Sequence, residues 1–200
     1  TVRAVVLTHA HLDHTAGLPL FIDDLFAQLK QPIRIHAEEA VIVILERDVF
    51  NWSVYPRFSE LTNDHGPVVE YLPFEKGTEF AVAHLRVTPL NVNHNVPSSG
   101  FVISDGKTVV AMTGDTAELD GFWQVVNELP KLSALLIECA FPDELRSLAE
   151  ISRHLTPAVV ETELMKFENK ECPVYVINIK PMYRDRTIEE IGLIGIPNIL

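Results

Sequence analysis

The chain carries the stretch Thr8-His9-Ala10-His11-Leu12-Asp13-His14, in which four imidazole or carboxylate side chains fall within six residues. The stretch follows residues 2–7, a β-branched and apolar run that predicts a short buried strand. Because alternate residues of an extended loop point the same way, His9 and His11 can bind one metal ion while Asp13 and His14 turn towards a neighbouring one. The stretch therefore predicts a metal centre at the end of a strand, in preference to an ordinary solvated loop.

Two later segments place similar side chains after predicted strands. Asn93-His94-Asn95 follows a strand predicted at residues 79–89, and Thr113-Gly114-Asp115-Thr116 follows a strand predicted at residues 108–112. Imidazole and carboxylate ligands suit zinc, iron or manganese, and no cysteine stands in any of these segments. A lone His94 would be an ordinary surface residue, and a lone Asp115 an ordinary turn residue. They support a metal site because they follow the first stretch in this order, each after a predicted strand.

Composition predicts a single globular domain spanning residues 1–200. A hydrophobic content of 47% allows a buried core without disulfide support. The only cysteines, Cys139 and Cys172, are too few for a disulfide framework, so we expect a reducing compartment, the cytoplasm. No segment approaches the roughly 20 apolar residues of a membrane span, so no membrane partner is expected. The net charge of −12 argues against binding of a nucleic acid polymer, whereas bound divalent metals could still attract a small anion.

Helices and strands are predicted along the whole chain. Further strands are predicted at residues 33–36, 68–72, 100–104, 134–137 and 174–177, with Asp105-Gly106-Lys107 as a tight turn. Helices are predicted at residues 17–29, 38–47, 119–127, 143–151, 156–167 and 188–193, and residues 50–66 read as an irregular loop. Because helices flank strands at both ends of the chain, this order indicates an α/β protein of the layered α/β/β/α class.

With these ligands in this order, the sequence resembles the metallo-β-lactamase superfamily, whose fold is a four-layer α/β/β/α sandwich. The resemblance implies two bound divalent metal ions, with zinc expected first. His9, His11 and His94 would hold the first metal. Asp13 and His14 would hold the second, and Asp115 would bridge the two.

Stretches between the ligands resemble a narrower family, the class II cyclic-nucleotide phosphodiesterases, nearly from end to end of the chain. They are Phe50-Asn51-Trp52-Ser53, Pro97-Ser98-Ser99-Gly100-Phe101, Glu138-Cys139-Ala140-Phe141-Pro142, His154-Leu155-Thr156-Pro157 and Ile179-Lys180-Pro181. This resemblance implies hydrolysis of a 3′,5′-cyclic nucleotide, with cyclic AMP expected, to the 5′-monophosphate. The implied partner is thus a small-molecule cyclic nucleotide.

The sequence His-Leu-Thr-Pro begins a predicted helix, with Thr156 as the N-cap and Pro157 as the first helical residue. Similarity to the related phosphodiesterases and tRNA-processing nucleases implies that His154 donates a proton or contacts the phosphate. Glu138, at the end of a predicted strand, would orient His154, and Asp13 is expected to be catalytic as well as a ligand. A surface histidine and an ordinary strand-end carboxylate remain the alternatives.

The sequence departs from the family pattern in two places. Asn178 stands where the family carries a histidine of the second metal site. An amide oxygen is a weaker donor to zinc, so we expect the second site to lose affinity or to take manganese or magnesium. The chain also opens just before the first motif, so we expect that preceding strands were lost. That loss leaves a periplasmic location open, exposes a sheet edge and favours a homodimer.

The expected mechanism is two-metal hydrolysis of a phosphodiester. Two metals about 3.5 to 4 Å apart activate a water and neutralise the phosphate, while His154 protonates the leaving group. Residues 50–56 and 96–100 are expected to hold the base and ribose. One alternative is another hydrolase of the superfamily, such as a tRNA-processing nuclease, a β-lactamase or a thioester hydrolase, although no basic arm for RNA is visible. The other is a degenerate metal-binding protein with little activity.

Overall fold

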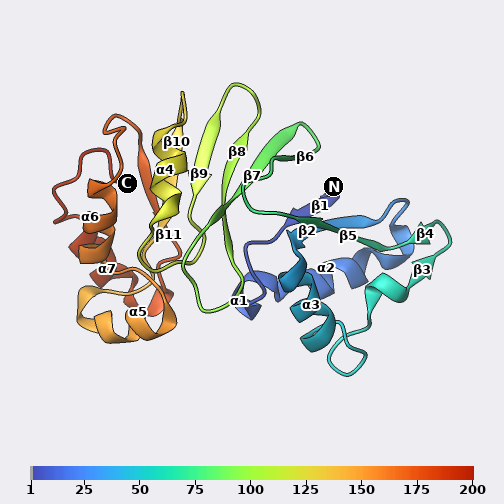
Figure 1. Ribbon diagram of the computed structural model, residues 1–200. Coiled ribbons are helices and arrows are strands. Elements are labelled where there is room, and N and C mark those ends of the chain that lie inside the picture. The colour runs from blue at the N-terminus through green and yellow to red at the C-terminus, as the bar shows by residue number, and fades with distance from the viewer. Residues whose placement is uncertain (1) are drawn as a thin grey trace. The chain divides into compact units, whose positions relative to one another are not determined.

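The computed structural model describes residues 2–200, which divide into two compact units. The first unit comprises residues 2–75 with Val96–Ser98, and the second comprises residues 76–95 and 99–200. Each unit has its own sheet and its own hydrophobic core, and both sheets are visible in Figure 1. None of the described helices is long and apolar enough to cross a bilayer.

A three-stranded parallel sheet, in the order β1-β2-β5, organises the first unit. Parallel neighbours need a crossover connection, and short helices supply both connections here. The elements are β1 (Ala4–Val6), α1 (Leu12–Thr15), α2 (Gly17–Leu25), η1 (Phe26–Gln28), β2 (Ile33–Glu38), α3 (Glu39–Asp48), η2 (Phe58–Glu60), β3 (Thr62–Asn63), β4 (Gly66–Pro67) and β5 (Val69–Phe74). The strands β3 and β4 form a separate two-stranded hairpin.

The core of the first unit joins the helices to this sheet. Ile22 of α2, Ile35 of β2 and Leu45 of α3 are completely buried and belong to one cluster. Phe50 and Phe58 belong to the same cluster, with their rings in edge-to-face contact at 5.7 Å between centroids. The segment predicted as an irregular loop at residues 50–66 therefore contributes aromatic side chains to the core, which anchor it to the unit.

A six-stranded mixed sheet, in the order β11-β10-β9-β8-β7-β6, organises the second unit. Strands β6 to β9 pair antiparallel, and β9, β10 and β11 pair parallel. The strands are β6 (Phe80–Val82), β7 (Leu85–Asn91), β8 (Ser99–Ser104), β9 (Val109–Met112), β10 (Ala134–Glu138) and β11 (Val174–Ile177). These pairings make β7, β9, β10 and β11 run in the same direction, so the segments that follow them leave the sheet at one edge.

Helices of the second unit gather beside β10 and β11 (Figure 1). They are α4 (Gly121–Asn127), η3 (Asp143–Leu145), α5 (Arg146–Ser152), α6 (Pro157–Met165), η4 (Pro181–Tyr183) and α7 (Arg184–Ile191). Phe122 of α4, Val160 of α6 and Ile191 of α7 pack into one cluster with Leu135 of β10. The strands that carry the candidate site are thus backed by a continuous core.

Most predicted elements are present, and the differences have local causes. The strand predicted at residues 79–89 is a hairpin of β6 and β7, because Ala83 turns the chain at a φ of 54° without the glycine or asparagine that signals such a turn. The motif loop contains the single-turn helix α1, the helix predicted at residues 17–29 ends as the 3₁₀ turn η1, and the last helix begins at Arg184.

Candidate metal centre

The histidine motif of the first unit lies between β1 and α2. The N–H of Leu7 donates to the carbonyl of His36 at 2.9 Å, so the chain stays paired with β2 for one residue beyond β1. The N–H of His14 and the hydroxyl of Thr15 both donate to the carbonyl of His11 at 3.0 Å. These bonds fold the end of the motif into the turn of α1, which brings the histidines of the motif close together.

The imidazoles of the motif converge. The Nε2 atom of His9 lies 3.1 Å from the Nδ1 atom of His11, and the ring centroids of His9 and His14 lie 4.2 Å apart. Two nitrogens that bind one zinc ion tetrahedrally at about 2.0–2.1 Å lie about 3.3 Å from each other. The His9 and His11 pair therefore fits a shared zinc ion. The Thr8 hydroxyl lies 3.0 Å from His9 Nδ1, an outer contact that would leave Nε2 available to a metal ion.

Asp13 lies beside His14 in the same unit. The Oδ2 atom of Asp13 is 3.8 Å from the Nε2 atom of His14, and the Asp13 side chain is 57% exposed. The pair is close enough to share an ion. The Asp13 carboxylate is thus more exposed to solvent than the His14 imidazole, whose side chain is 25% exposed.

His94 and Asp115 meet at the strand-end edge of the second sheet. The Nε2 atom of His94 lies 4.0 Å from the Oδ2 atom of Asp115, and His154 joins them so that one ligand atom from each lies within 4.8 Å of the others. Gly114 takes a left-handed φ of 62° in the turn from β9 to Asp115, a conformation that glycine adopts at little cost. Because Asp115 is only 3% exposed, its charge needs a cation or hydrogen-bond donors, which fits a divalent metal.

Glu138, the last residue of β10, is completely buried and forms hydrogen bonds with several segments of the site. Its Oε1 atom accepts the N–H of Thr116 at 2.9 Å and lies 2.8 Å from Nδ1 of His154. Its Oε2 atom accepts the N–H groups of Ala140 at 3.0 Å and Leu155 at 3.3 Å. Burial raises the pKa of Glu138, and the hydrogen bonds from His154 and the Thr116 backbone oppose that rise. Glu138 thus links the loop after β9 to His154, whose Nε2 is left for other contacts.

Asn178 reaches the same edge as the first residue after β11. Its Nδ2 atom donates to Oδ1 of Asp115 at 2.9 Å. Its backbone is left-handed, with a φ of 59°, which asparagine tolerates better than most residues. The amide therefore turns its donor group towards Asp115, whereas a metal ligand would offer its oxygen. This arrangement makes Asn178 a hydrogen-bond partner of the carboxylate, and its role as a ligand stays a prediction.

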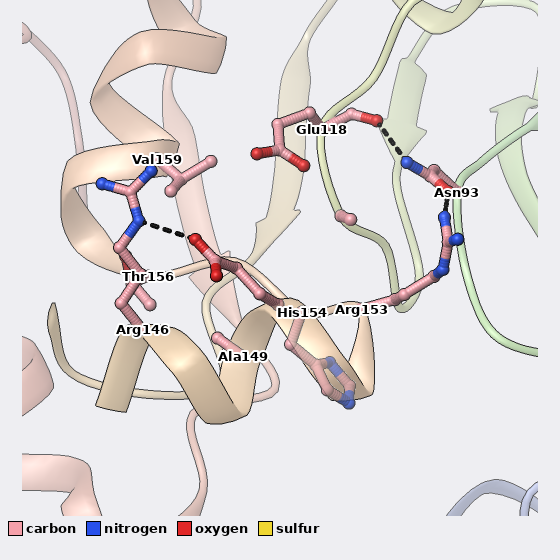
Figure 2. A pocket seen from close by; sticks show the side chains of 10 residues that line it. Asn93, Glu118, Arg146, Ala149, Arg153, His154, Thr156 and Val159 are labelled. Atoms are coloured by element: carbon pink, nitrogen blue, oxygen red, sulfur yellow. Dashed lines mark hydrogen bonds and ion pairs between the residues drawn. The ribbon is translucent and has the colours of Figure 1, made fainter. Parts of the chain in front are cut away.

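A polar cavity of about 140 Å³ lies beside His154 in the second unit (Figure 2). Arg146 and Glu150 of α5 form an ion pair at 3.0 Å on one side of it. On another side the guanidinium of Arg153 donates to Oδ1 of Asn93. The walls thus combine both signs of charge, and they connect α5 to the segment that carries His94.

The start of α6 agrees with its prediction in position and differs in its capping. Thr156 is the N-cap and Pro157 the first helical residue, but the Thr156 hydroxyl makes no hydrogen bond within the described residues. The N–H of Ala158 donates to Oδ1 of Asp143 at 2.9 Å instead. A carboxylate at a helix N-terminus is favoured by the helix dipole, so Asp143 takes over the capping role.

The ring Nδ1 atoms of His9 and His94 each have a contact that was not predicted from the sequence. The Thr8 hydroxyl contacts His9, and its position next to the motif could have revealed it. The carbonyl of Arg153 lies 3.0 Å from Nδ1 of His94 across 59 residues of sequence. No sequence signal could have revealed this contact, because it uses a backbone carbonyl, a group that every residue has.

Comparisons with known proteins agree with this fold. A β-lactamase superfamily domain matches residues 1–167. A probable 3′,5′-cyclic-nucleotide phosphodiesterase of Yersinia pestis is 26% identical over 208 residues, covering 92% of this chain and 59% of the relative. A 3′,5′-cyclic-nucleotide phosphodiesterase of Aliivibrio fischeri is 28% identical over 184 residues, covering 84% of this chain and 54% of the relative. The chain therefore spans less than two thirds of the length of either relative.

The crystal structure of unliganded yeast PDE1 superposes with a TM-score of 0.84 at 21% identity, covering 98% of this chain and 64% of that one. This likeness concerns the α/β fold. Since the superfamily domain matches most of the chain, the chain belongs to the metallo-β-lactamase superfamily.

Proposed function

We propose that the protein is a metal-dependent phosphodiesterase that hydrolyses a 3′,5′-cyclic nucleotide, cyclic AMP first, to the 5′-monophosphate. The observation that supports this most is the cluster of His94, Asp115 and His154, whose ligand atoms lie within 4.8 Å of one another at a strand-end edge. The names of the two relatives at 26% and 28% identity support the choice of substrate.

In this proposal the ligands of the two units form one dinuclear centre within a single domain of residues 1–200, built as a four-layer α/β/β/α sandwich. His9, His11 and His94 would hold the first metal, with zinc expected. Asp13 and His14 would hold the second, with zinc, manganese or magnesium expected, and Asp115 would be shared by both. Such ions would supply positive charge for the phosphate and activate the attacking water. Free, buried Cys139 and Cys172 support a reducing compartment, the cytoplasm.

His154 is the proton donor in this proposal. Attack by water forms a new bond to phosphorus, releases one proton and breaks the bond from phosphorus to the 3′ oxygen, which must then take up a proton. Because the Glu138 carboxylate holds Nδ1 of His154 at 2.8 Å, a protonated His154 has Nε2–H left to give to that oxygen.

The test is cyclic AMP hydrolysis by the zinc-reconstituted protein, with formation of 5′-AMP followed by chromatography. We expect Asp115→Ala to reduce turnover about 100-fold or more, with little change in melting temperature, because this carboxylate positions metals and adds little to the core. Asp185→Ala is the matched control, since its side chain is 99% exposed on α7. Wild-type protein that holds zinc without cleaving cyclic AMP, or an Asp115→Ala variant with full turnover, would overturn the proposal.

A second candidate is a metal-binding protein with little activity. The hydrogen bond from Asn178 to Asp115 favours it, because the amide occupies one oxygen of the carboxylate that would bridge the metals. The same assay separates the two candidates, since this one predicts bound metal without 5′-AMP.

A further inference from the structure

The last turn of α5 ends in an unusual conformation. Arg153, the C-cap residue, has φ 55° and ψ 60°, and the N–H of His154 returns to the carbonyl of Ala149 at 2.9 Å. Helices often end in such a left-handed residue, but glycine usually occupies the position because a side chain is strained there. An arginine keeps this left-handed backbone conformation only where contacts with neighbouring residues stabilise it.

The surroundings of this turn are the three residues Asn93, His94 and Asn95. The carbonyl of Arg153 lies 3.0 Å from Nδ1 of His94, and Nδ2 of Asn95 donates to the carbonyl of Ile151 at 3.1 Å. The Arg153 guanidinium donates to Oδ1 of Asn93, as Figure 2 shows. Every residue of the segment that carries His94 is therefore bound to the end of α5.

The contact with His94 decides which ring nitrogen carries the hydrogen. A carbonyl oxygen can only accept, so Nδ1 of His94 must be the donor. In the neutral imidazole the lone pair is then on Nε2, the atom that lies 4.0 Å from Oδ2 of Asp115. The end of α5 thus selects the form of His94 that offers Nε2 towards the carboxylate.

We propose that the left-handed turn at Arg153 is a positioning element for His94, which sets its tautomer and its ring orientation for metal binding through Nε2. The proposal rests on the proposed function only in assigning a metal to His94. Outer contacts of this kind are typically worth about 10 to 100-fold in metal affinity. In this role Arg153 acts through its carbonyl, on His94.

Two substitutions at Arg153 distinguish the effect of its backbone conformation from the effect of its side chain. Arg153→Gly and Arg153→Val both remove the guanidinium contact with Asn93, but glycine adopts the left-handed conformation freely, whereas valine strongly disfavours it. We expect Arg153→Val to bind zinc about 10-fold more weakly than Arg153→Gly, measured by competition with a chromophoric chelator. Arg146→Ala is the control, because Arg146 lines the same cavity and forms its ion pair with Glu150 of the same helix. The zinc affinity of this variant should match that of the wild type.

A second measurement needs no metal and no folded valine variant. Nitrogen-15 NMR of the metal-free wild-type protein reports the tautomer of His94, and we expect the hydrogen on Nδ1 in both the wild type and Arg153→Gly. A neutral His94 with its hydrogen on Nε2, or equal zinc affinity of folded glycine and valine variants, would overturn the positioning role. Failure of the wild type to bind zinc would instead overturn the proposed function. The tautomer of His94 in the metal-free protein would still test whether the turn at Arg153 positions this imidazole.

Discussion

Replacement of Gly100 by alanine tests how closely the second sheet holds the loop that carries Asp115. A Cβ atom on Gly100 would lie 2.7 Å from the carbonyl oxygen of Met112, 2.9 Å from that of Thr113 and 3.0 Å from Cγ1 of Val92. The two oxygens belong to the backbone at the end of β9, which leads within a few residues to Asp115. The added methyl group therefore pushes on the chain that positions this carboxylate.

The geometry sets the size of the effect. Ordinary contact begins at 3.4 Å, so the Met112 oxygen or the Gly100 backbone must move by about 0.7 Å. Forced packing of this kind costs roughly 1–3 kcal/mol of unfolding free energy. For a chain of this size, that loss lowers the melting temperature by about 2 to 12 °C. A shift near 1 Å in a catalytic group can cost on the order of 100-fold in turnover.

The assay compares Gly100→Ala with Gly121→Ala by thermal unfolding and by cyclic AMP hydrolysis. A Cβ on Gly121, the first residue of α4, meets nothing within 4 Å, so its replacement should leave turnover unchanged and stabilise by about 0.4–1 kcal/mol. A Gly100→Ala variant that melts at the wild-type temperature and keeps full turnover would show that β8 does not approach the end of β9 this closely.

Three further predictions each concern a single residue. Trp123→Phe removes the Nε1–H that donates at 2.7 Å to the buried carboxylate of Glu163, so we expect a loss of roughly 1.5–3 kcal/mol in urea unfolding, and an unchanged midpoint would contradict this. Burial lowers the pKa of His36 below its ordinary value. As the pH falls, the unfolded chain therefore binds more protons at this position than the folded chain does, and the free energy of unfolding decreases. Wild-type protein should therefore lose more stability than His36→Gln between about pH 7 and pH 5, and equal losses would count against it. Asn178→His should tighten the second metal by at least about 10-fold, read by chelator competition, because an imidazole replaces an amide that now donates to Asp115. Unchanged metal stoichiometry and turnover in that variant would remove Asn178 from the second site.

Local signals in the sequence were accurate where the interactions are short-range. The turn at Asp105 closes as predicted, because its Oδ1 accepts the N–H groups of Lys107 at 2.8 Å and Thr108 at 2.7 Å, and Gly106 supplies a φ of 88°. Pro157 starts α6 because its missing N–H costs nothing at that position. The hairpin at Ala83 was not predicted, because neither glycine nor asparagine stands at the turn to signal it.

The sequence by itself determined which side chains could bind metal and that they follow strands, because residue type and the alternation of apolar residues carry that information. Only the tertiary structure decided how each group is presented. Nδ1 of His94 is held by a carbonyl 59 residues away, and Nδ1 of His154 by Glu138 across 16 residues. The amide of Asn178 turns its donor to Asp115 across 63 residues. Backbone carbonyls are chemically alike in every residue, so the sequence cannot mark which one meets an imidazole, and the fold makes that choice by bringing distant segments within hydrogen-bond distance.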